Sequence, residues 1–491
     1  MSRALGRLGA RPGLIFISGA ALSVLAYLEA SAAGGYIGFP LDDAWIHQTY
    51  ARNLATLGQF AFIPGQPSAG STSPLWTLVL AIGYLAHIEY HVWTYALGAA
   101  LLALNAWLAY RLVLRLWPAA SGAALAAGLL VCFEWHLAWS AVSGMETLLF
   151  SACVLAVFVL DWPAQAGLVG AAAGLAVLTR PDGLSLLPFI AARAWLAHDR
   201  SWRSGVRAAL GFGVLFVPYL GLNYLLSGTP WPNTFYAKQA EYAILRSLPL
   251  WTRLGRVGAL PFIGAVVLLS PAIVAAAWRA GRSRQWEVWL PLGWVLALIG
   301  AYALRLPVTY QYGRYVMPAI PVLIAVGMGG LAQFARPRST ELMIRVVSRA
   351  WLAALVVVGA AFWLEGAIRY RADVRIIDTE MVASAQWVAG HTSAGSLVAA
   401  HDIGALGYFG GREVLDMAGL VSPQVIPFIR DETRLARWLD ASGANYLMTF
   451  PGWYPILTAP LDRQRLYVTG APYSPADGGE NMVVYSWAPK P

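Results

Sequence analysis

The chain has 491 residues, of which 58% are hydrophobic and 12% are charged, and its formal net charge is +9. The charged fraction is about half of the ~25% typical of soluble domains, so we exclude a soluble globular protein. A bilayer can surround the excess apolar surface, and the composition therefore predicts a polytopic membrane protein. Because the basic residues form short clusters between apolar runs, nucleic acid is not expected as a partner.

The first apolar run, Leu14–Ala33, follows Arg3, Arg7 and Arg11. The run could be a cleaved signal peptide, since residues 30–32 resemble a cleavage site. We favour an uncleaved signal anchor, because the run is close to spanning length and a motif-rich loop follows at once. The N-terminus is then cytoplasmic, and the loop that follows is extracytoplasmic.

The predicted first outer loop, residues 34–91, contains two interfacial segments. In Asp43–Leu57 the residues Ile46, Tyr50 and Leu54 recur at helical spacing, which predicts an amphipathic helix. The run Pro74–Ala86 is apolar, but at about 13 residues it is too short to cross a bilayer comfortably. We therefore expect an outer-leaflet or re-entrant helix there.

Together with the anchor, the apolar runs predict about 11 membrane spans. The further spans lie near residues 92–116, 119–136, 145–161, 164–178, 184–198, 206–226, 257–278, 287–304, 315–335 and 349–368. Arginine clusters, which include Arg200, then fall on the cytoplasmic side, as the positive-inside rule requires. Counting Pro74–Ala86 as a span would invert the later spans and place these clusters outside.

The composition turns polar after Arg369. We expect residues 1–369 to form a transmembrane catalytic domain and residues 370–491 a soluble α/β domain on the outer face. The candidate strands of this domain are Ser396–Ala400, Glu413–Met417, Tyr446–Phe450 and Met482–Trp487.

The polar motifs all fall on the outer side of this topology. They are Asp42-Asp43 and residues 68–74, 143–147, 179–183, 232–238, 311–315 and 401–404. Charges that converge at one membrane face suggest a site for an ionic headgroup. No cluster has the spacing of a metal site, so no metal ligands are predicted and no cofactor is firmly implied.

The acidic motifs also have structural interpretations. Asp42 and Asp43 could favour the positive end of a helix dipole, but paired acids at the lipid surface point more strongly to function. Ser143 and Glu146 fit a capping box, and Glu146 could instead bind substrate.

The basic motifs are open to two interpretations as well. Arg180 could be a substrate ligand or could snorkel towards lipid headgroups, and Lys238 is open to the same two interpretations. Arg314 is the better ligand candidate because tyrosines surround it, although these tyrosines could form an aromatic belt.

Two histidines lie close to acidic residues in the sequence. His47 follows Asp43 by four residues, so it could orient that carboxylate, bind a sugar hydroxyl or remain solvated. His401 and Asp402 follow a predicted strand and could bend back towards the membrane.

These motifs resemble the GT-C superfamily of membrane glycosyltransferases over nearly the whole chain, and most closely the bacterial branch that includes the arabinofuranosyltransferase AftB. The matching residues are Asp42-Asp43, Ala51-Arg52-Asn53-Leu54, Gly70-Ser71-Thr72-Ser73-Pro74-Leu75-Trp76, residues 143–147, Arg180-Pro181-Asp182 and Pro232-Asn233. Each motif is weak alone, but their order, spacing and common side form a strong signal together.

The resemblance implies a polyprenyl-phosphate sugar as donor and a first-loop aspartate as the catalytic carboxylate. The residue chemistry agrees, because an acceptor hydroxyl needs a base and a departing phosphate needs cationic hydrogen-bond donors. Asp43 has His47 as a neighbour, whereas the family often uses the first acid of the pair, so Asp43 and Asp42 both remain candidate bases of an inverting displacement. The expected phosphate ligands are Arg180, Lys238 and Arg314. The other expected substrate contacts are His47, Trp45, Glu146, Tyr236, His401 and Asp402.

We therefore predict a GT-C glycosyltransferase in a bacterial plasma membrane that acts on an extracytoplasmic glycan, lipid or protein. The main alternative is a transporter or flippase of a lipid-linked saccharide, which should show repeat symmetry and polar residues at mid-membrane. A polymerase or ligase for a preassembled glycan is a third hypothesis. The motifs specify neither the sugar nor the acceptor, and the oligomeric state is unknown.

Overall fold

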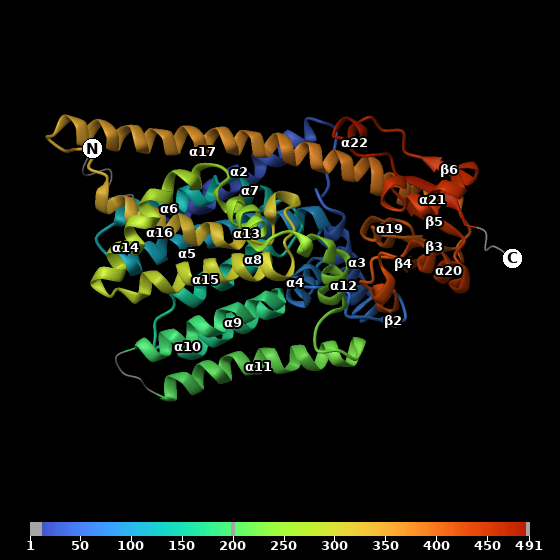
Figure 1. The fold of residues 1–491 in the computed structure, drawn as a ribbon, viewed down its shortest axis with the longest axis horizontal. Helices are drawn as coiled ribbons and strands as arrows, with labels where there is room; N and C mark the ends of the chain where they lie inside the picture. Colours follow the sequence, from blue (N-terminus) through green and yellow to red (C-terminus); the bar gives the residue numbers. More distant parts are fainter. Residues whose placement is uncertain (1–11, 198–201, 488–491) are drawn as a thin grey trace.

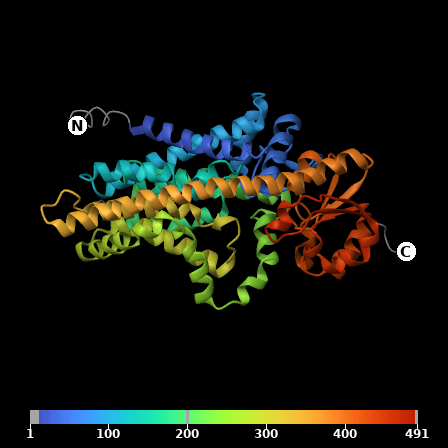
Figure 2. The ribbon, with the colours of Figure 1, turned by 90° about the horizontal axis from the view of Figure 1, so that it is seen from above.

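The computed structural model describes residues 12–197 and 202–487. Arg3, Arg7, Arg11 and Arg200, which the predicted topology uses, lie outside these ranges. The described chain forms an elongated bundle of helices with an α/β domain at one end (Figures 1 and 2).

Apolar helices make up the bundle. They are α2 (Pro12–Ala32), α5 (Tyr90–Leu116), α6 (Ser121–Cys132), α7 (Trp135–Ala141), α8 (Thr147–Val159), α9 (Ala166–Thr179), α10 (Leu187–Leu196), α11 (Trp202–Ser227), α13 (Leu250–Ala259), α14 (Ser270–Ser283), α15 (Trp286–Arg305), α16 (Ile320–Phe334) and α17 (Leu342–Ile377). Small residues let their backbones approach closely. A Cβ atom at Gly98 of α5, for example, would lie 1.7 Å from the carbonyl oxygen of Ala141.

Seven helices in the described ranges are long and apolar enough to cross a membrane, and an eighth span results if α6 and α7, bent by 54°, count together. Helices α8 and α9 are apolar but have 13 and 14 residues. At 1.5 Å per residue they are shorter than the ~30 Å apolar core of a bilayer. The chain is therefore a multi-pass membrane protein, while the total of about 11 spans stays a prediction.

The two segments expected as interfacial helices are α3 (Asp42–Leu57) and α4 (Pro74–Leu85). Helix α4 exposes Leu78, Ile82 and Leu85, as a lipid-facing helix should. Helix α3 differs from the expectation, because it packs against α4 and against α19 (Gly404–Phe409) of the α/β domain. Residues on both of its faces are therefore buried.

Helix α17 runs along the bundle and reaches the α/β domain (Figure 2). It has 36 residues and continues through a π-turn at Asp378–Val382 into α18 (Ala383–His391). Within this turn Glu380 is fully buried and accepts hydrogen bonds from Asn481 Nδ2 (2.9 Å) and the Met482 backbone N–H (2.7 Å). The turn thus fixes the angle at which the bundle meets the α/β domain.

The α/β domain is built on five strands, β3 (Leu397–Ala400), β4 (Glu413–Asp416), β5 (Tyr446–Thr449), β6 (Arg465–Val468) and β7 (Val483–Ser486). Their order is β4-β3-β5-β7-β6, with β3 parallel to β4 and β5, and β7 antiparallel to its neighbours. Helix α20 (Glu432–Ser442) packs Leu435 and Leu439 on the sheet core. The remaining short elements are β1 (Ala61–Ile63), β2 (Gln66–Pro67), α12 (Asn233–Glu241), α21 (Pro455–Thr458) and α22 (Tyr473–Ala476).

Four of the five strands agree with the predicted strands to within about two residues. The sequence did not predict the edge strand β6, because Arg465, Leu466 and Val468 are exposed and the strand lacks a buried face. His401 and Asp402 follow β3 directly. In parallel sheets the carboxyl ends of strands are where sites commonly form.

Candidate functional site

Helix α3 begins at Asp42 and Asp43, and the two carboxylates face different parts of the molecule. The buried carboxylate of Asp42 accepts hydrogen bonds from the backbone N–H groups of Gly404 (2.6 Å) and Ala405 (2.8 Å). Burial and the neighbouring Asp402 raise the pKa of Asp42 to about 8. Because Gly404 and Ala405 open α19, Asp42 holds the α/β domain against the bundle.

Asp43 faces two cations from distant segments instead. Its Oδ2 atom accepts hydrogen bonds from Lys238 Nζ, at 3.2 Å, and from Arg314 Nη2. The Tyr315 hydroxyl accepts from the same two donors, at 3.3 Å each. Burial alone would raise the pKa of Asp43, but the charges of Lys238 and Arg314 outweigh burial and hold the pKa well below its usual value. Asp43 is therefore ionised and binds a proton weakly while both cations contact it.

Arg314 is only 5% exposed, and only part of its guanidinium is paired. Its Nη1 atom is buried, and no described residue accepts a hydrogen bond from it. A buried donor without a partner costs about 1–3 kcal/mol, which an oxygen atom of a ligand would relieve. One side of the guanidinium thus binds Asp43 and the other is available to an anion.

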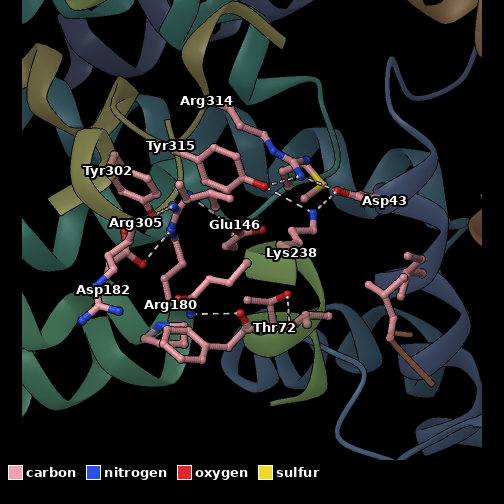
Figure 3. Close-up of a pocket in the computed structure, with 18 of the residues that line it drawn as sticks. Asp43, Thr72, Glu146, Arg180, Asp182, Lys238, Tyr302, Arg305, Arg314 and Tyr315 are labelled. Atoms are coloured by element: carbon pink, nitrogen blue, oxygen red, sulfur yellow. Dashed lines mark hydrogen bonds and ion pairs between the residues drawn. The ribbon is translucent and has the colours of Figure 1, made fainter. Parts of the chain in front are cut away.

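A second polar cluster surrounds Arg180 across the cavity (Figure 3). Arg180 Nε donates to Asp182 Oδ1 at 3.1 Å, and Nη2 donates to the Tyr302 hydroxyl at 2.6 Å. The Tyr302 hydroxyl donates in turn to Asp182 Oδ2 at 2.7 Å. Arg180 Nη1 lies 3.6 Å from Glu146 Oε1. Two carboxylates therefore already neutralise Arg180. Arg314, in contrast, forms an ion pair with the carboxylate of Asp43.

Glu146 lies between Arg180 and His47, and its Oε2 atom is 3.5 Å from His47 Nε2. Burial opposes ionisation of Glu146, but the neighbouring His47 and the charge of Arg180 lower its pKa to about 2. The other ring nitrogen of His47 is 3.5 Å from Ser71 Oγ. His47 therefore lies beside Glu146 and is buried, so the interpretation of a solvated histidine is wrong for this structure.

The expected capping box at the start of α8 does not form either. The Ser143 hydroxyl donates to the Ser140 carbonyl at 2.8 Å, and the side chain of Glu146 makes no capping hydrogen bond in the described helix. The carboxylate turns inward because Arg180 and His47 offer it charged and polar partners there.

Contacts between loops fix the position of Lys238 on α12. The Thr72 hydroxyl donates to the Thr234 hydroxyl at 3.0 Å, and the Asn233 backbone N–H donates to the Ala69 carbonyl at 3.0 Å. Asn233 Nδ2 also donates to the Leu420 carbonyl of the α/β domain, at 3.2 Å. The Gly-Ser-Thr-Ser and Pro-Asn motifs thus dock on each other and hold α12 beside α3.

These groups surround a cavity of about 1130 Å³ at the end of the bundle next to the α/β domain, which we call the bundle cavity. Figure 3 shows Lys238, Arg314 and Tyr315 converging near Asp43, with Arg180, Asp182 and Tyr302 on the opposite side. The residues that line it include Asp43, Ile46, His47, Thr72, Glu146, Arg180, Asp182, Phe235, Lys238, Tyr302, Arg305, Arg314, Tyr315 and Leu420. The three basic residues expected as phosphate ligands therefore share one cavity.

A second cavity, of about 1800 Å³, lies between α3, α12 and the α/β domain, and we call it the domain cavity. The residues that line it include Asp42, Asp43, Ile46, Lys238, Glu241, Tyr242, Tyr310, Arg314, Tyr315, His401, Asp402, Leu420, Arg430, Glu432, Trp453 and Tyr454. Asp43, Lys238, Arg314 and Tyr315 belong to both sets. Asp43 therefore stands in the wall that the two cavities share.

His401 is fixed on the domain side of this wall. Its Nε2 atom is 3.3 Å from Glu241 Oε1 of α12, and Nδ1 is 2.6 Å from the Tyr454 hydroxyl. Burial lowers the pKa of His401, but Tyr454 and Glu241 outweigh it and hold the pKa well above its usual value. The loop after β3 thus bends back towards the bundle side of the molecule, where it contacts α12.

Two aromatic residues that the sequence predicts as substrate contacts line neither cavity. Trp45 is 1% exposed, and its ring packs on those of Phe39 and Phe409, at centroid distances of 5.0 and 4.7 Å. Tyr236 also lies outside the residues that line either cavity. Neither side chain lines a cavity in this structure, so their roles as sugar contacts stay predictions.

Two functional candidates escaped the sequence analysis. Arg305, the last residue of α15, lines the bundle cavity, and Glu241 holds His401. Arg305 resembles any basic residue at the end of a membrane span, and Glu241 belongs to no motif. Among the described residues no group of three His, Cys, Asp or Glu is placed to hold a metal ion.

Comparison with known proteins gives a domain family and a set of solved structures. Residues 367–485 match a domain of unknown function, DUF8728. No curated protein matches the chain. The structure of ArnT from Cupriavidus metallidurans bound to undecaprenyl phosphate is similar, with a TM-score of 0.65 and 17% identity over 96% of this chain and 97% of that one.

The oligosaccharyltransferase of Archaeoglobus fulgidus is similar as well. Its structure with a tethered acceptor peptide has a TM-score of 0.61 and 10% identity, over 96% of this chain and 74% of that one. Its complex with an inhibitory peptide and a dolichol-phosphate has a TM-score of 0.56 and 10% identity, over 89% of this chain and 69% of that one. With these neighbours, the described helices and the terminal α/β domain, the chain has the GT-C fold.

Proposed function

We propose that this protein is a glycosyltransferase that moves a sugar from a polyprenyl phosphate to an extracytoplasmic acceptor. One observation carries the proposal: Asp43, paired with Lys238 and Arg314, stands in the wall between two cavities. A base at such a wall can contact an acceptor from one side while its cationic neighbours contact a phosphate on the other. The lipids in the neighbouring structures, undecaprenyl phosphate and dolichol-phosphate, support this donor class.

The charges that line the bundle cavity favour a monophosphate. Four cations stand against three carboxylates, which leaves one net positive charge when His47 is neutral. The cations are Arg180, Lys238, Arg305 and Arg314, and the carboxylates are Asp43, Glu146 and Asp182. A sugar phosphodiester carries a single negative charge and would balance this cavity. A diphosphate diester carries two negative charges and would leave one uncompensated.

The proposed reaction is a single displacement at the anomeric carbon. The oxygen of the acceptor hydroxyl forms a bond to that carbon as the bond to the phosphate oxygen breaks. The electron pair of the broken bond stays on the polyprenyl phosphate, and the hydroxyl proton passes to Asp43. One attack from the side opposite the leaving group inverts the anomeric centre. Lys238 and Arg314 stabilise the charge that develops on the phosphate.

Donor binding would also strengthen the base. In the unliganded protein the two cations depress the pKa of Asp43 and make it a weak proton acceptor. A phosphate oxygen that takes hydrogen bonds from Lys238 and Arg314 Nη1 would reduce their pull on Asp43. The pKa of Asp43 would then rise towards the range useful for proton transfer, and only when the donor is present.

The remaining assignments are narrower parts of the same proposal. The protein would lie in a bacterial plasma membrane with its N-terminus in the cytoplasm and the α/β domain outside. Arabinofuranose is one candidate sugar, on the resemblance of the motifs to the branch that includes AftB. Glycans, lipids and proteins are the acceptor classes to compare, and polyprenyl lipid is the expected membrane partner.

The test uses purified protein with a panel of radiolabelled polyprenyl-phosphate sugars, including arabinofuranose, mannose, glucose and an aminosugar. We expect one donor to be consumed, with release of polyprenyl phosphate and inversion of the sugar linkage. A flippase would instead move labelled lipid across a vesicle membrane without cleaving it. Lipid movement without sugar transfer would therefore replace our proposal with that alternative.

A further inference from the structure

The domain cavity contains a carboxylate that the described residues leave partly unsatisfied. Asp402 lines this cavity, and its Oδ2 atom is buried without a hydrogen-bond partner among the described residues. Buried carboxylate oxygens normally accept hydrogen bonds, and each one left without a donor costs about 1–3 kcal/mol or more. The Oδ2 atom of Asp402 can therefore accept a hydrogen bond from a ligand.

The loop that carries Asp402 is held on both sides. On one side His401 contacts Glu241, at 3.3 Å, and the Tyr454 hydroxyl, at 2.6 Å. On the other side the Gly404 N–H donates to Asp42 at 2.6 Å. Asp402 thus sits between two anchored neighbours, one on α12 and one on α3. A side chain fixed in this way is preorganised for a ligand and does not need the ligand to order it.

The other lining groups indicate what kind of ligand fits. Five carboxyl groups line the domain cavity, against four cations when His401 is protonated. Because the pKa of Asp42 is raised to about 8, the ionised carboxylates and the cations balance near neutral pH, and the cavity offers an anionic ligand no net positive charge. Trp453 is 50% exposed, and its indole ring meets His401 edge to face at 5.1 Å. An exposed aromatic face beside carboxylates suits a neutral saccharide, whose apolar ring face and hydroxyl groups need these two partners.

We propose that the domain cavity binds a neutral saccharide as the acceptor, and that Asp402 accepts a hydrogen bond from a hydroxyl group next to the attacking one. This inference rests on the proposed transferase function. Asp402 would hold the acceptor so that the attacking hydroxyl oxygen faces the anomeric carbon, while the single proton of that hydroxyl passes to Asp43 in the shared wall. The new bond joins the acceptor oxygen to the sugar, and the electron pair leaves with the phosphate.

The test compares transfer with donor hydrolysis, in which water replaces the acceptor. The acceptor probes are neutral octyl glycosides of arabinose, mannose and glucose and one octyl glycoside of a uronic acid. In Asp402→Asn we expect the acceptor KM to rise about 10- to 100-fold, as for loss of a hydrogen bond to a charged group, while donor hydrolysis stays within threefold of wild type. Asp402→Glu, which keeps the carboxylate, should recover part of the loss.

Asp477→Asn is the matched control, because Asp477 is an exposed carboxylate of the same domain outside the residues that line either cavity. It should leave both reactions unchanged. An unchanged acceptor KM in Asp402→Asn, or an equal loss of transfer and hydrolysis in both Asp402 variants, would overturn the role of Asp402. Hydrolysis by wild type with no transfer to any neutral glycoside, or preference for the uronic acid, would overturn the acceptor class. Absence of both reactions in wild type contradicts the proposed function itself.

A pH profile separates this role from a merely structural one. Burial raises the pKa of Asp402 to about 6, so the carboxylate is largely ionised above that pH. We expect kcat/KM for the acceptor to rise through about pH 6 in wild type and to lose this limb in Asp402→Asn. The charged groups that act on this carboxylate are Asp42 and Asp43 of α3, Lys238 and Glu241 of α12, and the adjacent His401. A limb that persists in the variant would assign the titration to one of these groups and contradict the proposal.

Discussion

The two cavities that meet at Asp43 have different charge balances. Cations exceed carboxylates in the bundle cavity, whereas cations and ionised carboxylates balance in the domain cavity, where Asp42 has a pKa of about 8. Segments of the membrane bundle supply most of the first cavity, and loops of the α/β domain supply much of the second. This difference separates the two halves of one reaction, because a departing phosphate needs positive charge and an attacking hydroxyl needs a hydrogen-bond acceptor.

Asp43→Asn should have the largest effect, because it removes the base from the wall itself. We expect sugar transfer to fall about 10³-fold, within the range for loss of a general base. The measurement is single-turnover transfer from a labelled polyprenyl-phosphate sugar at saturating donor. Asp477→Asn serves as the control for loss of one carboxylate. Transfer within threefold of wild type would exclude Asp43 as the base.

Arg314→Lys tests the bundle side of the wall. Lysine keeps the charge but loses the fork with which Arg314 can bind Asp43 and an anion together. We expect kcat to fall about 10²-fold for transfer and for donor hydrolysis alike, because both reactions release the same phosphate.

Arg305→Lys is the matched control for that change, since Arg305 lines the same cavity but is exposed at the end of α15. It should change kcat less than threefold. No loss in either variant would show that the bundle cavity uses only its total charge, and equal losses in the two would show that Arg314 makes no phosphate contact that Arg305 lacks.

Asp42→Asn tests how the domain side is held in place. An amide can accept only one of the two hydrogen bonds that the carboxylate accepts from Gly404 and Ala405. We expect faster hydrogen exchange at these two backbone groups and about a fivefold loss of transfer, as for a cap worth ~1 kcal/mol. Donor hydrolysis should change less, because it does not need the loop of Asp402.

Asp431→Asn provides the comparison for Asp42→Asn. Asp431 caps α20 by accepting a hydrogen bond from the Arg434 N–H at 3.0 Å, within the same domain and outside the residues that line either cavity. Loss of this cap should lower the stability of the domain and should not reduce transfer more than donor hydrolysis. If both variants lose transfer equally, domain stability and not the position of α19 limits the reaction.

Local patterns were enough to predict much of this architecture. Strands β3, β4, β5 and β7 bury one or both faces, so runs of apolar residues mark them in the sequence. Pro74–Leu85 forms a helix at the expected place and length for the same reason. The burial of α3 could not be predicted, because the covering helix α19 begins more than 350 positions later in the chain.

The contacts within the site were harder to predict from the sequence than the helices and strands. Composition and motifs selected Asp42, Asp43, Lys238 and Arg314, but not which acid faces which partner. Adjacent residues on a helix point about 100° apart, and their partners here come from segments hundreds of residues away. Only the fold separates the acid that holds α19 from the acid that faces two cations. Glu241 escaped notice because its partner His401 lies in another domain.

Changing the pH should have the smallest effect, through the pair of His401 and Glu241. The folded pKa of His401 is above its usual value and that of Glu241 is below its usual value. Stabilisation by His401 is therefore fully present below its unfolded pKa of about 6.5 and is lost as the pH rises through its folded pKa. Stabilisation by Glu241 is present above about 4.3 and is lost as the pH falls through its folded pKa. The pair is thus complete between about pH 4.3 and 6.5.

In that window we expect wild type to exceed His401→Gln in Tm by about 2 °C, a difference that shrinks at alkaline pH. A Tm difference that does not vary with pH would mean that His401 stabilises the domain by packing against Trp453 and Tyr454 and not by its charge.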